Sequence, residues 1–69
     1  DIDDLAKELI IEMVFQLGKT GVSKFRNMWK HLSTLEYSLA ASEMLDSRWA
    51  KQTPNRAQNM SNKMSSIGA

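Results

Sequence analysis

The chain has 69 residues, a formal net charge of +1 and no cysteine. A chain of this length forms one domain at most and buries only about 60% of the surface that its unfolded form exposes. The composition excludes a disulfide or a thiolate metal site, and the near-neutral charge argues against strong attraction to nucleic acid or an anionic membrane. The longest apolar run, Leu9 to Leu17, is too short for the roughly 20 residues that cross a bilayer. We therefore expect no membrane span.

The first segment is predicted to be a helix, because apolar residues recur every three or four positions from Ile2 to Leu17. Ile11 and Phe15 widen its apolar face, so we expect residues 5–17 to form a central helix that others surround on most sides. The remaining polar stripe consists of Glu8, Glu12 and Gln16. The acidic residues that complement the positive end of its dipole are Asp1, Asp3 and Asp4. Gly18 predicts the end of this helix.

The middle of the chain is predicted to hold further short helices. Apolar residues spaced three or four apart from Val22 to Leu32 indicate one broken helix or two short ones. Ser33 and Glu36 have the spacing of a capping box, which predicts another helix from about Leu35 to Leu45.

The last third begins with two cap signals. Ser47 precedes a short turn, and Thr53 followed by Pro54 places an N-cap before a proline at the first helical position. Burial is expected to weaken after Gln58, so the C-terminal end should fray. The predicted fold is one all-α domain over residues 1–69, a compact bundle of about five short helices.

Judged by their type and spacing alone, few residues indicate a catalytic or metal-binding role. Glu8 and Glu12 lie one turn apart on a single helix, and such a pair cannot straddle a glycosidic bond, so they are interpreted as a solvated stripe. His31 has no second ligand at metal spacing and is expected to be half-buried or on the surface. We predict no metal and no other cofactor.

Two groups of polar residues allow a binding interpretation. Basic residues around Trp29 permit a nucleic-acid face, but we rank it below simple packing of Trp29. These basic residues are Lys19, Lys24, Arg26 and Lys30. A second group surrounds Trp49 and combines an aromatic ring, amides, a hydroxyl and guanidinium groups, which suits a sugar. It comprises Arg48, Trp49, Gln52, Thr53, Asn55 and Arg56.

Two long segments resemble a known family. Residues 13–22, with Phe25 and Asn27 following, resemble the MVFQMGxTGVxxFxN segment of T-even phage lysozymes. Residues 47–57 resemble the SRWxxQTPNRA segment of the same family, and the spacing between the segments also matches. The resemblance runs from about Asp4 to Met64 and identifies the C-terminal lobe of such an enzyme.

The resemblance implies a muramidase that cleaves peptidoglycan in a cleft between two lobes. The catalytic Glu, Asp and Thr of the family belong to an N-terminal lobe that this sequence lacks, so no catalytic residue is expected here and the chain alone is predicted to be inactive. On the remaining wall, Gln16 and Trp49 would form a supporting contact, and Thr53 would lie near the saccharide. Arg56 would reach towards the catalytic acid, alter its proton affinity and fix its position.

Departures from the family suggest a partner. Met64 stands where the family has a large aromatic, and a family helix that covers the core is missing, so Leu9, Met13 and Phe15 are expected to be partly exposed. We expect the partners to be a peptidoglycan saccharide and a catalytic lobe or another chain, in a phage protein that acts on the bacterial wall from the host or from a virion tail. The alternatives are a non-catalytic wall-binding or phage structural protein and, ranked lower, a nucleic-acid binder.

Overall fold

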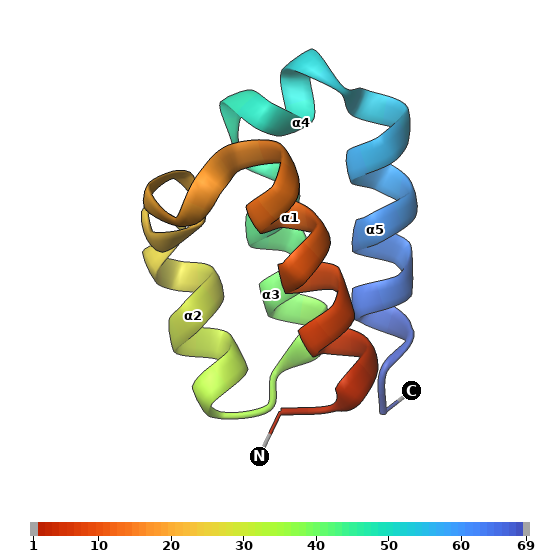
Figure 1. The fold of residues 1–69 in the computed structure, drawn as a ribbon. Helices are drawn as coiled ribbons and strands as arrows, with labels where there is room; N and C mark the ends of the chain where they lie inside the picture. The colour runs from red at the N-terminus through yellow and green to blue at the C-terminus, as the bar shows by residue number, and fades with distance from the viewer. Residues whose placement is uncertain (1, 69) are drawn as a thin grey trace.

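The computed structural model describes residues 2–68, so the expected dipole contribution of Asp1 lies outside the described residues. Five helices follow one another along the chain (Figure 1), and residues 2–68 contain no strand. They are α1 (Asp4–Ser23), α2 (Arg26–Ser33), α3 (Tyr37–Leu45), α4 (Arg48–Gln52) and α5 (Pro54–Ser66). The predicted all-α fold of about five short helices is confirmed. None of these helices is long and apolar enough to cross a membrane.

Helix α1 starts at a side-chain cap and bends at a glycine. The carboxylate of Asp3 accepts a hydrogen bond of 2.8 Å from the backbone N–H of Leu5. At Gly18 the backbone adopts φ 76° and ψ 166°, a conformation open essentially to glycine alone, and the ribbon turns sharply there (Figure 1). The predicted helix end at Gly18 is therefore a kink, after which helical structure resumes and continues to Ser23.

The turn between α2 and α3 differs from the predicted capping box. Ser33 is the last residue of α2, and its hydroxyl donates to the carbonyl of Lys30 at 2.6 Å. Glu36 occupies the N-cap position of α3 without a side-chain cap. Leu35 has φ 60°, which costs a non-glycine residue about 1–2 kcal/mol and prevents it from being helical. Helix α3 consequently begins at Tyr37 and not at Leu35.

The cap signals of the last third are only partly confirmed. Ser47 caps α4 as predicted, because its hydroxyl accepts a hydrogen bond of 3.1 Å from the N–H of Ala50. Thr53 and Pro54 take the predicted N-cap and first helical positions of α5. The hydroxyl of Thr53, however, donates backwards to the carbonyl of Trp49 at 3.0 Å and caps nothing. This bond joins the end of α4 to the start of α5.

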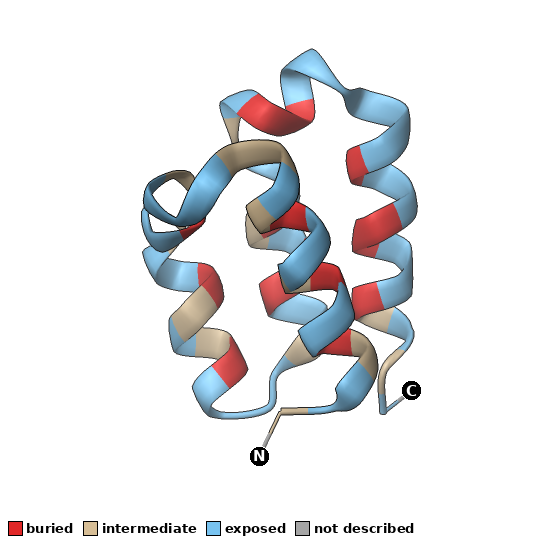
Figure 2. Cartoon of the chain, viewed as in Figure 1, coloured by how far each residue is buried: buried red, intermediate tan, exposed pale blue. Residues whose placement is uncertain are grey.

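Methionine and alanine form most of the core, which lies on the inward faces of the helices (Figure 2). All five methionines are buried: Met13, Met28, Met44, Met60 and Met64. Their unbranched side chains fill irregular gaps between short helices that cross at several angles. Since Met64 is fully buried and α5 continues to Ser66, the expected loss of burial towards the C-terminus is wrong.

The outer face of α1 has no neighbour within the described chain. Helix α3 packs against α2, α4 and α5, whereas α1 lies on one side of the bundle against α5 (Figure 1). Ile11 is 54% exposed and Phe15 is 85% exposed, so other helices do not surround α1 on most sides as predicted. The exposure expected for Phe15 is confirmed, whereas Leu9 and Met13 are buried, because they face inward from the same helix. An apolar pattern predicts a partner but does not say whether that partner lies in the same chain.

Candidate functional site

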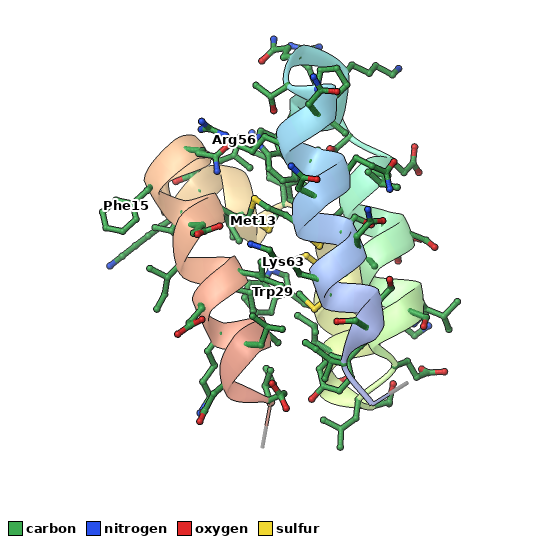
Figure 3. The ribbon with its side chains drawn as sticks, turned by 90° about the vertical axis from the view of Figure 1, so that its right-hand side faces the viewer. Met13, Phe15, Trp29, Arg56 and Lys63 are labelled. Atoms are coloured by element: carbon green, nitrogen blue, oxygen red, sulfur yellow. The ribbon has the colours of Figure 1, made fainter. Side chains whose placement is uncertain are left out.

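A hollow of about 380 Å³ lies between the middle of α1 and the start of α5. It is lined by Glu12, Phe15 and Gln16 from α1 and by Arg56 from α5. Phe15 points away from the bundle, while Arg56 extends from α5 near the end of α1 (Figure 3). The hollow therefore combines an amide, a carboxylate and a guanidinium group beside Phe15, whose ring points outward.

The Gln16 side chain in this hollow is held at both ends of its amide. Its Oε1 accepts a hydrogen bond of 2.8 Å from the indole N–H of Trp49. Its Nε2 donates to the carbonyl of Glu12 at 3.3 Å and to the sulfur of Met60 at 3.7 Å. These bonds come from three helices, so the amide is fixed before any ligand arrives. The contact predicted between Gln16 and Trp49 is present.

The indole of Trp49 serves as a support and not as a stacking surface. Only 5% of the residue is exposed, so a sugar has no access to the ring face, and the interpretation of Trp49 as an aromatic platform is wrong for this structure. Helix α4 directs the ring inward because Trp49 and Ala50 both belong to the core. Thr53, which is exposed, binds the Trp49 carbonyl and so adjoins the same group.

Arg56 is exposed at the rim of the hollow. The ion pairs within residues 2–68 join Lys7 to Asp4 and His31 to Glu36, so the guanidinium lies beyond 4.0 Å from every carboxylate of this part of the chain. A guanidinium group carries five N–H donors in a planar fork that suits carboxylates and hydroxyl groups. The donors of Arg56 therefore have no carboxylate partner within residues 2–68.

Two lining residues were not predicted as site residues. Glu12 was interpreted as part of a solvated stripe, and it is exposed, but the hollow brings it beside Gln16 one helical turn away. Phe15 was interpreted as part of the apolar face of α1 that stays partly exposed, and not as a lining residue. The sequence could have indicated Glu12, because it lies four residues before Gln16 and so shares one helix face with it. The exposure of Phe15 was expected from the missing family helix, but its place at the edge of this hollow appears only when the helices are packed.

The remaining polar clusters offer no metal site within residues 2–68. His31 is half-buried, as expected, and its Nδ1 lies 3.6 Å from Oε1 of Glu36, which is too long for a hydrogen bond. The pKa of Glu36 lies below its ordinary value of 4.5, chiefly because the Thr34 hydroxyl donates to its carboxylate and then because of His31. Trp29 packs as predicted, with its indole N–H bonded to the carbonyl of Val22 at 3.0 Å.

Two curated proteins of Dictyostelium discoideum are similar to this chain. "Probable T4-type lysozyme 1" is 40% identical over 57 residues, and "Probable T4-type lysozyme 2" is 37% identical over 57 residues. Each alignment covers 83% of the chain. The chain is a relative of the T4-type lysozymes. No family model matches it, and no solved structure is a significant match.

The chain spans about a third of the length of these T4-type lysozymes, since each alignment covers 34% of the relative. The relationship to lysozymes inferred from residues 13–22 and 47–57 is thereby confirmed. The comparisons assign no role to individual residues, so the saccharide contacts of Gln16, Trp49, Thr53 and Arg56 stay predictions.

Proposed function

We propose that this chain is one lobe of a lysozyme-type glycosidase and that its hollow forms one wall of a cleft for a peptidoglycan saccharide. We assign the chain to the C-terminal lobe of such an enzyme and propose that it acts at the bacterial cell wall. The observation that carries this proposal is the Trp49–Gln16 hydrogen bond, which holds a fixed amide beside Arg56 in one hollow.

The hollow suits recognition of a polar, uncharged or acidic sugar. Gln16 retains one free lone pair on Oε1, Arg56 supplies several donors and Glu12 supplies an acceptor. Hydrolysis of a glycoside requires two carboxyl groups roughly 5 to 9.5 Å apart on opposite sides of the scissile bond. Glu12 is the single carboxylate that lines this hollow, so at least one carboxyl group of the catalytic pair would be supplied from outside it.

The outer face of α1 offers that lobe a place to dock. Ile11 and Phe15 are exposed one turn apart, and Phe15 also lines the hollow. A lobe that covers this apolar face would come to rest directly beside Gln16 and Arg56. About two thirds of each relative lie outside the aligned region, which is enough chain for such a lobe.

A chimera tests the proposal. The matching segment of "Probable T4-type lysozyme 1" is replaced by this chain, and release of reducing ends from isolated sacculi is measured for the chimera, for its Arg56→Ala variant and for this chain alone. We expect hydrolysis by the chimera, none by the chain alone and at least about a tenfold loss for Arg56→Ala. Lys63→Ala is the matched control, because it removes an exposed cation from the same helix outside the hollow.

The outcomes separate this proposal from a non-catalytic role. A folded chimera without activity contradicts the glycosidase lobe. If this chain and the chimera then sediment with sacculi while a Gln16→Ala/Arg56→Ala variant does not, a wall-binding protein is the better description. If Arg56→Ala and Lys63→Ala lower the activity equally, the hollow is not the saccharide wall.

A further inference from the structure

A second hollow, of about 390 Å³, lies where the turn between α2 and α3 meets the end of α5. Its apolar lining residues are Leu35, Tyr37, Leu39 and Ile67. Leu35 is 52% exposed and has a φ of 60°, which favours glycine or asparagine, so the described fold gives no reason for a leucine there. Leu39 is 46% exposed beside the same hollow. Two exposed leucines at one hollow indicate an apolar surface that another segment covers.

The charges at this hollow do not select a charged partner. Glu36 is its one lining carboxylate, and it already lies beside His31 and Lys30. Among residues 2–68, no lysine or arginine lines the hollow. The occupant is therefore recognised by apolar contact, and the position of the hollow along the chain decides which segment can reach it.

Both ends of the described chain lie at this hollow. Ile67 and Gly68 line it directly. At the other end, the backbone N–H of Asp3 donates a hydrogen bond of 3.0 Å to the hydroxyl of Tyr37, which is also a lining residue. Figure 1 shows the start of α1 and the end of α5 together where α2 turns into α3. Polypeptide joined to the start of α1 would therefore leave from the wall of the hollow.

We propose that this hollow docks the segment that connects the start of α1 to the other lobe of a two-lobe lysozyme. The inference rests on the proposed function, in which this chain, about a third of the length of the T4-type lysozymes it matches, is joined to a larger part. A tethered segment has an effective concentration on the order of millimolar, which favours it over a separate partner of equal affinity. Its apolar side chains would pack on Leu35, Leu39 and Ile67.

The connection would also leave the candidate saccharide site free. The two hollows share no lining residue, and the start of α5, which carries Arg56, is at the opposite end of the bundle (Figure 1). A segment held between Leu35 and Ile67 would therefore tie the lobes together without covering Gln16 or Arg56.

The test uses thiol labelling, because the chain has no cysteine and a single introduced thiol reports how exposed its position is. Leu39→Cys is prepared in the chain alone and in a chimera in which the chain replaces the matching segment of "Probable T4-type lysozyme 1". The rate of reaction with a maleimide at this position is measured by mass spectrometry, and we expect it to be at least about tenfold slower in the chimera. Leu45→Cys is the matched control, because Leu45 is an exposed leucine of α3 outside the hollow, and it should react equally fast in both proteins.

A second chimera identifies the covering segment. The residues of the relative that join the start of α1 are replaced by a flexible glycine–serine linker of equal length, which offers no apolar side chains. Labelling of Leu39→Cys should then return to the rate of the chain alone. Where a chimera does not fold, the joining segment is added to the chain as a free peptide, and it should slow the labelling of Leu39→Cys but not of Leu45→Cys.

The outcomes separate this inference from the proposed function. The docking is overturned if Leu39→Cys reacts equally fast in the chain and in the first chimera, if the glycine–serine linker leaves the protection unchanged, or if the free peptide has no effect. A chimera that is protected but inactive supports the docking and counts against the glycosidase lobe. A chimera that is active but unprotected overturns the docking and supports the glycosidase lobe.

Discussion

The indole N–H of Trp49 donates a hydrogen bond of 2.8 Å to the amide oxygen of Gln16, and this bond connects α4 to α1 across 33 positions of sequence. Trp49 is buried and Gln16 is half-buried, so the bond lies largely out of water. It also orients the Gln16 amide in the candidate saccharide hollow. One hydrogen bond therefore serves both the packing of α4 and the geometry of the site.

Trp49→Phe should lower the free energy of unfolding by about 1–3 kcal/mol, because it leaves the Gln16 oxygen without its partner in a partly buried place. Part of the loss comes from the smaller ring, and a double-mutant cycle with Gln16→Leu isolates the part that belongs to the bond. Urea unfolding of the four proteins gives the coupling energy, which we expect to be about 1 kcal/mol. A coupling energy near zero would mean that the bond does not contribute to stability.

Gly18→Ala should destabilise the chain by about 1–3 kcal/mol, although an added Cβ would meet no atom within 4 Å. The loss arises from the backbone, because φ 76° with ψ 166° is outside the regions that side chains tolerate. Gly18→Asn distinguishes this conformation from an ordinary left-handed turn. Asparagine would rescue a left-handed turn, but it should be no better than alanine here, and thermal unfolding of the two variants measures the difference.

Local signals in the sequence predicted much of the fold. Gly18 marked a break in α1, Ser47 the start of α4, and Thr53 with Pro54 the start of α5. These signals could be found in the sequence because each boundary depends on a backbone conformation or a hydrogen bond within a few residues. The capping box at Ser33 failed because a positive φ at Leu35 separates Ser33 from α3. That backbone conformation has no signal in a leucine, which rarely adopts it.

The site was less predictable because it depends on how helices pack. The resemblance to lysozymes indicated Gln16 and Arg56, and the structure brings both to one hollow. The sequence reasoning expected exposure of Leu9, Met13 and Phe15 alike, but it did not show that only Phe15 of these three faces solvent, nor that Trp49 faces the core. Which face of a widely apolar helix is covered is decided by the other helices.

Substitutions at Met13 and Phe15 measure how much the covered and the exposed face of α1 each contribute to stability. Met13→Ala should lower the free energy of unfolding by about 2–5 kcal/mol, because it opens a cavity in the core. Phe15→Ala should change it by less than about 0.5 kcal/mol, because the ring contributes little to this chain alone. Binding of a hydrophobic dye should fall on Phe15→Ala, since the variant removes exposed apolar surface. Equal stability losses would mean that Phe15 packs against this chain.

Glu36 makes stability depend on pH at the turn between α2 and α3. The hydrogen bond from Thr34, followed by His31, holds the pKa of Glu36 below 4.5 in the folded chain. A carboxyl group with a lowered folded pKa stabilises the fold at pH values above its unfolded pKa. This contribution is lost as the pH falls through the folded value, below 4.5.

Glu36→Gln should therefore be less stable than the parent at neutral pH, and the difference should shrink as the pH falls from about 5 to about 2. Urea unfolding at a series of pH values measures it. Thr34→Val is the matched variant, because it removes the larger cause and leaves the carboxylate, so it should reduce the same pH dependence in part. A stability difference that stays constant over this range would show that glutamine disturbs the turn by its shape, and that the charge of Glu36 contributes nothing.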